Sequence, residues 1–386
     1  MYQFNEQEIE IKEQIENILI KEKLSSSNYS TVQESVQLGI EILSRLGYLG
    51  INIPSKYGGV ELDNVSKMLI VKLLAKTNAS LAHVFSAHVF GFVEAIVEFG
   101  TEYQKDNLLP KLATGEEIGT LSITEPNGIS PDVLVTRAER QGEYFVINGS
   151  KSMLTNAKQA KYALVLLKTK NYNKITGDYS QLSLMIVDLK KKSGLSFGKI
   201  EETMGLEGAQ ICDVHFDNYT VSEKYLLGKE GEGLKTLVKL LNYTRIANAA
   251  VALGIAEAAL DEGIKYTKMR QLNKMPLMSN PQISIILTDV QKDIEICHLL
   301  TFYTASLLDR SLGDIQQNST IAKLHVTETA KKICDSILQL HGGYGYLKDY
   351  RIEQLYRDIR ITTIIGGPSE LLKTILSFNL FKQSEK

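Results

Sequence analysis

The stretch Tyr144-Phe-Val-Ile-Asn-Gly149 marks the point at which a helical chain becomes a β-rich one. Its aromatic and β-branched residues favour a strand, and Asn-Gly is typical of a tight turn, so a strand that runs into a turn is predicted here. Three short β-rich runs follow at Tyr162–Leu167, Leu182–Val187 and Ile211–Phe216, with the polar stretch Thr169–Ser180 between two of them. Because no helical pattern separates these runs, they predict a small antiparallel sheet or barrel.

Helical patterns lie on both sides of the β-rich region. Before it, Ile70, Leu73 and Leu74 begin an apolar stripe at helical spacing, and the mostly apolar run Leu81–Val97 is typical of a buried helix. After it, one helical stripe consists of Ile283, Ile286, Val290, Ile294 and Cys297, and a second helical stretch contains Ile321, Leu324, Ile333 and Ile337. The order of helices, strands and helices predicts an α+β chain that is mainly α.

Composition and charge exclude several classes of protein. The 386 residues carry a formal net charge of -2, which gives no strong basic field for nucleic acid or an anionic membrane. The Glu-rich N-terminus lacks the features of a signal peptide, and no apolar run reaches the roughly 18 residues of a membrane span, so a cytoplasmic protein is expected. Three scattered cysteines and six histidines without metal-ligand spacing predict neither a disulfide framework nor a metal site.

An ordered series of local motifs is more informative. It comprises Phe99-Gly-Thr-Glu-Tyr-Gln-Lys105, Leu109–Glu116, Ile123-Thr-Glu-Pro126, Asn148-Gly-Ser-Lys151 with Leu154-Thr-Asn156, Leu226–Gly233, and Gln339-Leu-His-Gly-Gly-Tyr-Gly-Tyr346 with Arg357-Asp358. The series resembles the acyl-CoA dehydrogenase family. That resemblance implies an N-terminal helical domain (1–119), a central small antiparallel β domain (120–228) and a C-terminal four-helix bundle (229–386). It also implies a homotetramer or homodimer that binds FAD at the domain junction and across a subunit interface.

The resemblance assigns one group of flavin-binding residues to the β region. Thr124 of the Thr-Glu-Pro segment and Ser130 of the following turn match the residues that bond the flavin and its phosphates. The turn is about one residue longer than in the family and contains Pro131, which removes a backbone donor. Met153 takes the place of an aromatic residue against the flavin ring, and the Thr two residues later is Thr155. Met is apolar and polarizable, so it can cover a ring face, although a lone Met more often fills a core.

A second group lies in the C-terminal part of the chain. Gln339, Gly342 and Gly343 resemble the segment that receives the FAD pyrophosphate from a neighbouring subunit, where glycines let backbone amides approach phosphate. The same glycines are also typical of a helix C-cap. Arg270 matches the residue that contacts the diphosphate across the interface. The Phe and Gly expected after it are replaced by Asn273 and Lys274, which weakens the adenine and phosphate contacts that the resemblance implies.

The catalytic carboxylate of the family has no counterpart in this sequence. Alignment from Arg357-Asp358 places Gly366 at the position of the base, and Thr244 occupies the alternative position just before Arg245. Glu370, four residues after Gly366, is the alternative base. A base must come within hydrogen-bonding distance of the proton that it removes, so this role requires the Glu370 carboxylate to reach the α-proton of the substrate. The backbone N–H of Gly366 and the Arg245 side chain remain available to the substrate carbonyl.

The resemblance therefore implies an FAD-dependent oxidoreductase that acts on an acyl thioester of coenzyme A or of an acyl carrier protein. Its default reaction is α,β-dehydrogenation, with an electron-transfer flavoprotein or oxygen as electron acceptor. The missing base leaves two alternatives open. One is altered flavin chemistry, such as decarboxylation, desulfination or oxygenation, and the other is binding of FAD and acyl thioester without turnover.

Overall fold

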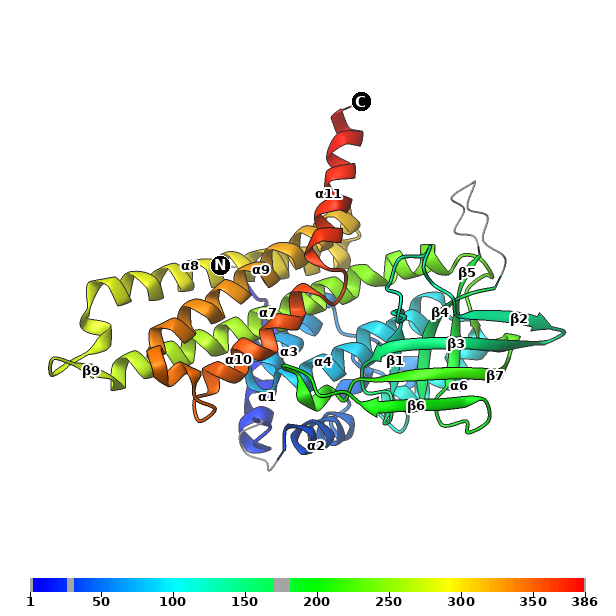
Figure 1. Ribbon diagram of the computed structural model, residues 1–386, viewed down its shortest axis with the longest axis horizontal. Helices are drawn as coiled ribbons and strands as arrows, with labels where there is room; N and C mark the ends of the chain where they lie inside the picture. Colours follow the sequence, from blue (N-terminus) through cyan, green and yellow to red (C-terminus); the bar gives the residue numbers. More distant parts are fainter. Residues whose placement is uncertain (1–2, 26–30, 170–180, 385–386) are drawn as a thin grey trace.

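The computed structural model describes residues 3–25, 31–169 and 181–384, so most of the polar stretch Thr169–Ser180 lies outside the described residues. The N-terminal part is helical (Figure 1). Its main elements are α1 (Glu6–Lys21), α2 (Val32–Arg45), α3 (Asn64–Thr77), α4 (Ala79–Ser86), the π-helical segment η4 (Ala87–Val93), α5 (Glu94–Phe99) and α6 (Glu102–Ala113). Side chains of Asn5, Thr31, Asp63, Asn78 and Thr101 cap five of these helices by accepting a backbone N–H in the first turn.

The run α4–η4–α5 forms one continuous apolar segment, Ala79–Phe99, with the length and composition of a membrane-spanning helix. However, 78% of its most apolar window is buried inside the protein, as the sequence predicts for a core helix. Its π-helical part lies next to the first strand, where the His88 Nδ1 accepts the Gly119 N–H at 3.1 Å. Segments of π-helix are frequent at functional sites, and this one borders the sheet.

The central part is an eight-stranded sheet. Its strands are β1 (Gly119–Ser122), β2 (Arg137–Gln141), β3 (Tyr144–Leu154), β4 (Tyr162–Lys168), β5 (Leu182–Asp188), β6 (Leu195–Ile200), β7 (Cys212–Ser222) and β8 (Leu226–Leu227). They lie in the order β6-β7-β3-β2-β4-β5-β8, with β1 paired to β4. Most pairs are antiparallel, as predicted, but β1 and β4 are parallel and β2 meets β4 in parallel at Arg137 and Lys168. The sheet is therefore mixed. Its parallel pair involves β1, the strand that follows directly after the helical part.

The predicted turn at Asn148-Gly149 is wrong, because β3 continues through these residues. The register between β3 and β7 shifts between Ile147 and Gly149, where β7 contributes one residue more than β3, and Gly149 has a φ of +137°. A Cβ on Gly149 would lie 2.6 Å from the Thr136 Cα. Glycine is thus used here for a bulge and a close backbone approach rather than for a hairpin turn.

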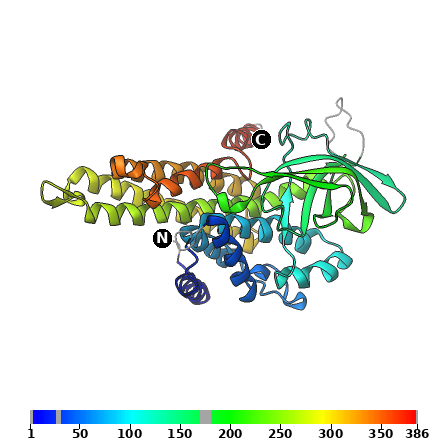
Figure 2. The same ribbon diagram turned by 60° about the horizontal axis from the view of Figure 1, so that its bottom comes forward.

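The C-terminal part is a bundle of long helices with a short hairpin at one tip (Figures 1 and 2). It comprises α7 (Gly233–Met269), β9 (Gln271–Leu272), β10 (Met275–Pro276), α8 (Pro281–Arg310), α9 (Ile315–His341), α10 (Arg351–Ile359) and α11 (Ser369–Ser384). The stripe predicted on α8 is only partly buried. Val290, Ile294 and Cys297 are buried, whereas Ile286 near the start of the helix is exposed.

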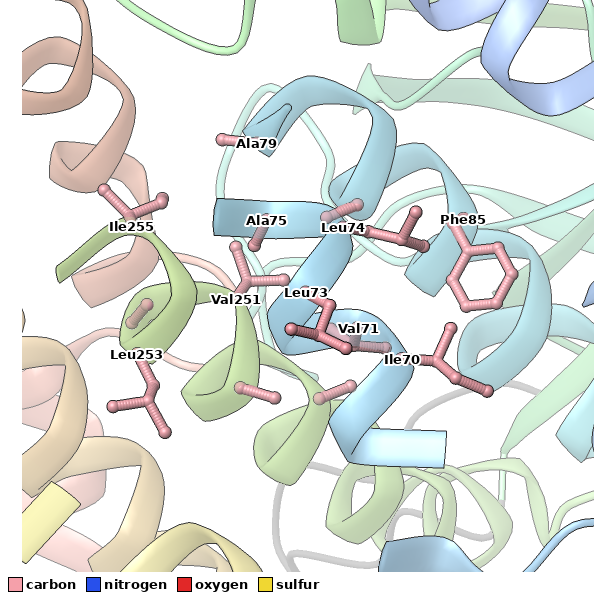
Figure 3. Packing of buried hydrophobic residues seen from close by; sticks show 14 of the residues in the cluster. Ile70, Val71, Leu73, Leu74, Ala75, Ala79, Phe85, Val251, Leu253 and Ile255 are labelled. Carbon is pink, nitrogen blue, oxygen red and sulfur yellow. The ribbon is translucent and has the colours of Figure 1, made fainter. Parts of the chain in front are cut away.

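The N-terminal helices and the bundle share one hydrophobic core. Val251 of α7 lies beside Leu73 and Ala75 of α3 (Figure 3). The two helices approach closely at Gly254, where an added Cβ would lie 2.2 Å from the Lys72 carbonyl oxygen. Any larger residue at this position would push α3 and α7 apart.

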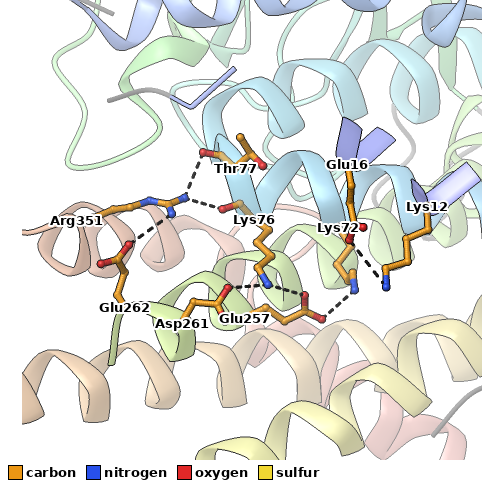
Figure 4. A network of polar contacts seen from close by, with 9 residues as sticks. All are labelled: Lys12, Glu16, Lys72, Lys76, Thr77, Glu257, Asp261, Glu262 and Arg351. Carbon is orange, nitrogen blue, oxygen red and sulfur yellow. Dashed lines mark hydrogen bonds and ion pairs between the residues drawn. The ribbon is translucent and has the colours of Figure 1, made fainter. Parts of the chain in front are cut away.

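A polar network reinforces the same junction (Figure 4). Lys72 of α3 pairs with Glu257 of α7 at 3.0 Å, and Lys76 pairs with Asp261 at 2.7 Å. Arg351 of α10 donates to the Lys76 carbonyl oxygen at 2.6 Å. These contacts join α3, α7 and α10.

Candidate active site

Gly366 lies in the loop between α10 and α11, and side chains from two bundle helices hold this loop in place. The Arg245 Nε of α7 donates to the Gly366 carbonyl oxygen at 3.3 Å, and its Nη1 donates to the Thr320 Oγ1 at 3.0 Å. Asn248 donates to the Thr362 carbonyl oxygen at 2.8 Å. The Lys323 Nζ of α9 donates to the carbonyl oxygen of Gly367 at 2.7 Å.

Two buried cations give this loop a positive environment. Burial lowers the pKa of Arg245 to about 10. Burial, together with the charge of Arg245, lowers the pKa of Lys323 to about 8. Among the residues that the structure describes, no carboxylate lies within ion-pairing distance of either side chain. The arrangement favours negative charge near Gly366, as in an enolate or a carboxylate.

The backbone at Gly366 is in the left-handed region, with a φ of +69°. An added Cβ would meet only Arg245 and Asn248, each at an ordinary contact distance of 3.9 Å. A side chain therefore has room at Gly366, but it adopts a strained backbone conformation. Within the described residues, the Gly366 N–H donates no hydrogen bond, which leaves a donor free in the loop.

The two other positions considered for a base differ in exposure. Glu370 is exposed in the first turn of α11 and makes no ion pair within the described part of the chain. The Thr244 Oγ1 donates back to the Leu241 carbonyl oxygen of its own helix at 3.2 Å. The structure thus places no buried carboxylate at either position.

Three residues of the first predicted flavin group, Thr124, Met153 and Thr155, lie together at the end of β3 that faces α4. Thr124 and Ser152 are joined by a backbone hydrogen bond of 2.8 Å, which brings Thr124 next to Met153. Met153 lies at a second bulge of β3, has a φ of +59° and is 50% exposed, so its side chain is free to contact a ligand. Ser130 lies exposed in the loop between β1 and β2.

Sequence reasoning missed the ion pair between Lys151 and Glu125, which supports the region around Thr124 and β3. Lys151 and Glu125 have fully buried side chains and pair at 2.8 Å. Glu125 also accepts the backbone N–H groups of Val135 and Thr136, at 2.6 and 3.1 Å, and so closes the loop that carries Ser130. Burial acts to raise the pKa of Glu125, but Lys151 and these hydrogen bonds outweigh it, so the net pKa is lowered. The quoted motifs contain both residues, but no local pattern links them.

His83 is the second residue that sequence reasoning missed. Its place in the apolar run Leu81–Val97 favours a core histidine, but its Nε2 lies 3.1 Å from the Thr155 Oγ1, which is a predicted flavin contact. His88 of the same helical run does match the core interpretation, since it is fully buried against Gly119. Only the packing of α4 on the end of β3 distinguishes the two histidines.

The second group of predicted flavin residues meets in one pocket. Arg270, Gln339, Gly342 and Gly343 all line a cavity of about 450 Å³ at the tip of the bundle. An added Cβ on either glycine would meet no atom within 4 Å, so both face open space. The Tyr344 ring lies under Arg270, 5.3 Å from its guanidinium carbon.

The departures after Arg270 have a structural role. Asn273 and Lys274 connect β9 to β10 and both have positive φ, at 52° and 66°. Two central residues with positive φ are typical of a tight hairpin turn. Asn suits this backbone, whereas Lys adopts it at a cost.

The β9–β10 hairpin lies at one end of the molecule, and the sheet lies at the other (Figure 1). Arg270 lies beside β9 at one tip of the bundle, whereas Met153 and Thr155 lie at the sheet. We call each group a half-site, because its chemistry suits a different part of a dinucleotide. The open glycine backbone and Arg270 fit a pyrophosphate, and Thr155 with Met153 fits a polar, flat ring.

Comparison with known proteins identifies the architecture. Three family models match consecutive parts of the chain: the acyl-CoA dehydrogenase N-terminal domain at residues 5–116, the middle domain at 120–219 and the C-terminal domain at 231–381. An acyl-CoA dehydrogenase of Bacillus subtilis is 35% identical over 339 residues, which cover 88% of each chain. The caffeyl-CoA reductase-Etf complex subunit CarC of Acetobacterium woodii is 31% identical over 384 residues, covering 98% of this chain and 100% of that protein. The solved structure of butyryl-CoA dehydrogenase from Megasphaera elsdenii has a TM-score of 0.90 at 30% identity, covering 99% and 100% of the two chains.

The fold and these matches define an FAD-dependent oxidoreductase that acts on acyl thioesters. The chain belongs to the acyl-CoA dehydrogenase family. The predicted fold, class of enzyme and cofactor are thereby confirmed.

Proposed function

We propose that this chain catalyses α,β-dehydrogenation of an acyl thioester at a site where Gly366 replaces the carboxylate base of its family. The proposal rests on the Gly366 loop, which is held in place and offers a free backbone donor. Arg245, Asn248 and Lys323 fix this loop from two helices, and the Gly366 N–H remains free as a donor. A fixed donor beside a buried cation is suited to a thioester carbonyl that gains negative charge during the reaction.

The reaction removes a proton from the α-carbon and a hydride from the β-carbon. When bound, FAD supplies the hydride acceptor. The Gly366 N–H and the nearby charge of Arg245 then polarise the carbonyl and stabilise the enolate. Proton removal is the step for which the loop holds no carboxylate, so we expect it to be slow with simple saturated substrates. Glu370 is the alternative base and would have to turn toward the loop.

The reverse reaction, reduction of an α,β-unsaturated thioester, is the second candidate. It is favoured by the relative from Acetobacterium woodii, a caffeyl-CoA reductase-Etf complex subunit that matches 98% of this chain. The same relative supports an electron-transfer flavoprotein, rather than oxygen, as the electron partner. We further propose that the chain functions in the cytoplasm, in keeping with three cysteines that are all buried and unpaired.

Substitutions at Gly366 test the proposal. Gly366→Glu restores a carboxylate, Gly366→Gln is its uncharged match, and Gly366→Ala measures the effect of the backbone alone. Each substitution costs about 1–3 kcal/mol because φ is +69°. A positioned base contributes about 10²–10⁴-fold in rate. We therefore expect Gly366→Glu to bleach its flavin faster than the wild type and Gly366→Gln with butyryl-CoA, octanoyl-CoA or the matching carrier-protein thioesters.

FAD content is measured first, so that loss of cofactor is not mistaken for loss of chemistry. Rapid bleaching of the wild type that disappears in Glu370→Gln would identify Glu370 as the base and contradict the proposed role of Gly366. Dehydrogenation would be ruled out if the wild type and all the variants bind FAD but none of them is bleached by any saturated thioester. Oxidation of the dithionite-reduced protein by enoyl thioesters would then favour the reductase direction.

A further inference from the structure

His83 of α4 connects the N-terminal helices to the end of β3, where Thr155 lies. Its Nε2 lies 3.1 Å from the Thr155 Oγ1, although the two residues are 72 positions apart in the sequence. Thr155 itself is fixed, because its carbonyl oxygen accepts the Thr120 Oγ1 hydroxyl at 2.9 Å.

The His83 imidazole is neutral at physiological pH. Burial lowers its pKa to about 4, and within the part of the chain that the structure describes no neighbouring charge counteracts this effect. A neutral imidazole carries one N–H donor and one acceptor nitrogen, and it exchanges these roles by changing tautomer. His83 can therefore either donate to the Thr155 hydroxyl or accept from it.

We propose that His83 is a positioning residue, which sets the direction of the Thr155 hydroxyl toward bound FAD and so adjusts the reduction potential of the flavin. The proposal rests on the proposed function only in placing FAD against Thr155. The hydroxyl has a single hydrogen. When His83 donates to the oxygen, that hydrogen is free for the flavin. When His83 accepts the hydrogen, the oxygen can only accept from the flavin.

The two arrangements suit the two oxidation states. The flavin nitrogen that receives the hydride is an acceptor before the transfer and carries an N–H after it. Whichever of the two His83 hydrogen bonds is the more stable in the folded protein favours the oxidation state that it matches, and so shifts the equilibrium between the two states. An aliphatic residue at position 83 cannot do this. A hydrogen bond contributes about 0.5–1.5 kcal/mol net, which corresponds to a change of roughly 2- to 10-fold in the equilibrium between oxidised and reduced protein.

The test is a redox titration of the FAD-bound protein without substrate, monitored by its visible spectrum. His83→Leu should shift the equilibrium by roughly 2- to 10-fold, where tenfold equals about 30 mV for a two-electron couple. It should also alter the fine structure of the flavin absorption band. His83→Gln, whose amide can donate or accept, should remain close to the wild type. Thr155→Val should shift the equilibrium by itself, and adding His83→Leu to it should have no further effect.

Equal potentials and spectra in the wild type and His83→Leu, with FAD still bound, would overturn the proposal. Additive shifts in the double variant would do the same, since they would show that His83 does not act through Thr155. If His83→Leu does not fold, His83→Asn replaces it, because its shorter side chain does not reach Thr155. These outcomes do not depend on turnover. A protein that shows the predicted shifts but is bleached by no thioester would support the role of His83 and contradict the proposed function.

Discussion

At the scale of single residues, the fully buried pair of Lys151 and Glu125 makes a sharp prediction. Lys151→Met leaves the Glu125 carboxylate buried without a counter-charge, because the remaining partners of Glu125 are backbone N–H groups. Breaking a buried pair from one side typically costs about 3–5 kcal/mol. We expect a loss of this size in the free energy of unfolding, measured by urea denaturation, together with weaker FAD binding through the loop that carries Ser130.

The double variant Lys151→Met with Glu125→Gln is the matched control. The Gln amide at position 125 carries no charge and still accepts a backbone N–H. Much of the free energy of unfolding that Lys151→Met loses should therefore return. If the double variant is as unstable as Lys151→Met alone, the packing of the lysine stem, and not the unpaired charge, dominates the effect.

At the scale of elements, Asp358 of α10 joins the bundle to the loop between β6 and β7. Its carboxylate accepts the Leu206 N–H at 2.7 Å. Burial raises its pKa from 3.8 to about 6, against the effects of the Leu206 hydrogen bond and the charge of Arg357. Because the folded state holds the proton more tightly, this group stabilises the fold most below about pH 4. That stability is lost as the pH rises through 6, by about 3 kcal/mol in total.

Asp358→Asn should remove this pH dependence. The amide resembles the protonated acid and still accepts the Leu206 N–H. The free energy of unfolding, measured between pH 4 and pH 8, should therefore fall more steeply in the wild type than in the variant. Parallel curves for the two proteins would show that Asp358 is ionised in the folded state at a normal pH and would contradict the raised pKa.

At the scale of the whole molecule, the tip that bears the β9–β10 hairpin lies at the other end of the molecule from the sheet (Figure 1), so we predict that a second copy brings the two half-sites together. The tip that bears Arg270 also exposes a run of apolar side chains, namely Met269, Leu272, Met275, Met278, Ile285 and Ile286. An exposed patch of this kind is typical of a protein interface. We therefore predict a homodimer or homotetramer in which Arg270→Ala lowers the affinity for FAD, measured by fluorescence titration.

Mixed oligomers give a decisive control. Arg270→Ala and Thr155→Val each damage one half of every site in their own homo-oligomer. When the two variants assemble together, a site shared between subunits is restored wherever the intact halves meet, so part of the FAD binding should return. A monomer that retains FAD, as seen by analytical ultracentrifugation, or a mixture that recovers none, would show that each chain holds its FAD alone.

The order of helices, strands and helices could be predicted from sequence because hydrophobic periodicity is a local property. Runs such as Leu81–Val97 and Tyr162–Leu167 contain their own signal, and the structure confirms both. The departure of Gly366 from the family pattern is also visible in the sequence, because it depends on position within a motif. Only the tertiary structure shows its positive φ and the empty space beside it.

Contacts between distant residues were decided by the tertiary structure alone. The bulge at Gly149 depends on the close approach of Thr136, and Gly254 depends on the crossing of α3 and α7. Lys151 finds Glu125 across 26 positions, and His83 finds Thr155 across 72. A local pattern records the propensity of each segment, but a hydrogen bond between segments depends on how their packing brings the two atoms within about 3 Å. For this protein, the sequence by itself determined the family and the cofactor and predicts a missing carboxylate, whereas packing decided which side chains lie beside Gly366 and Thr155.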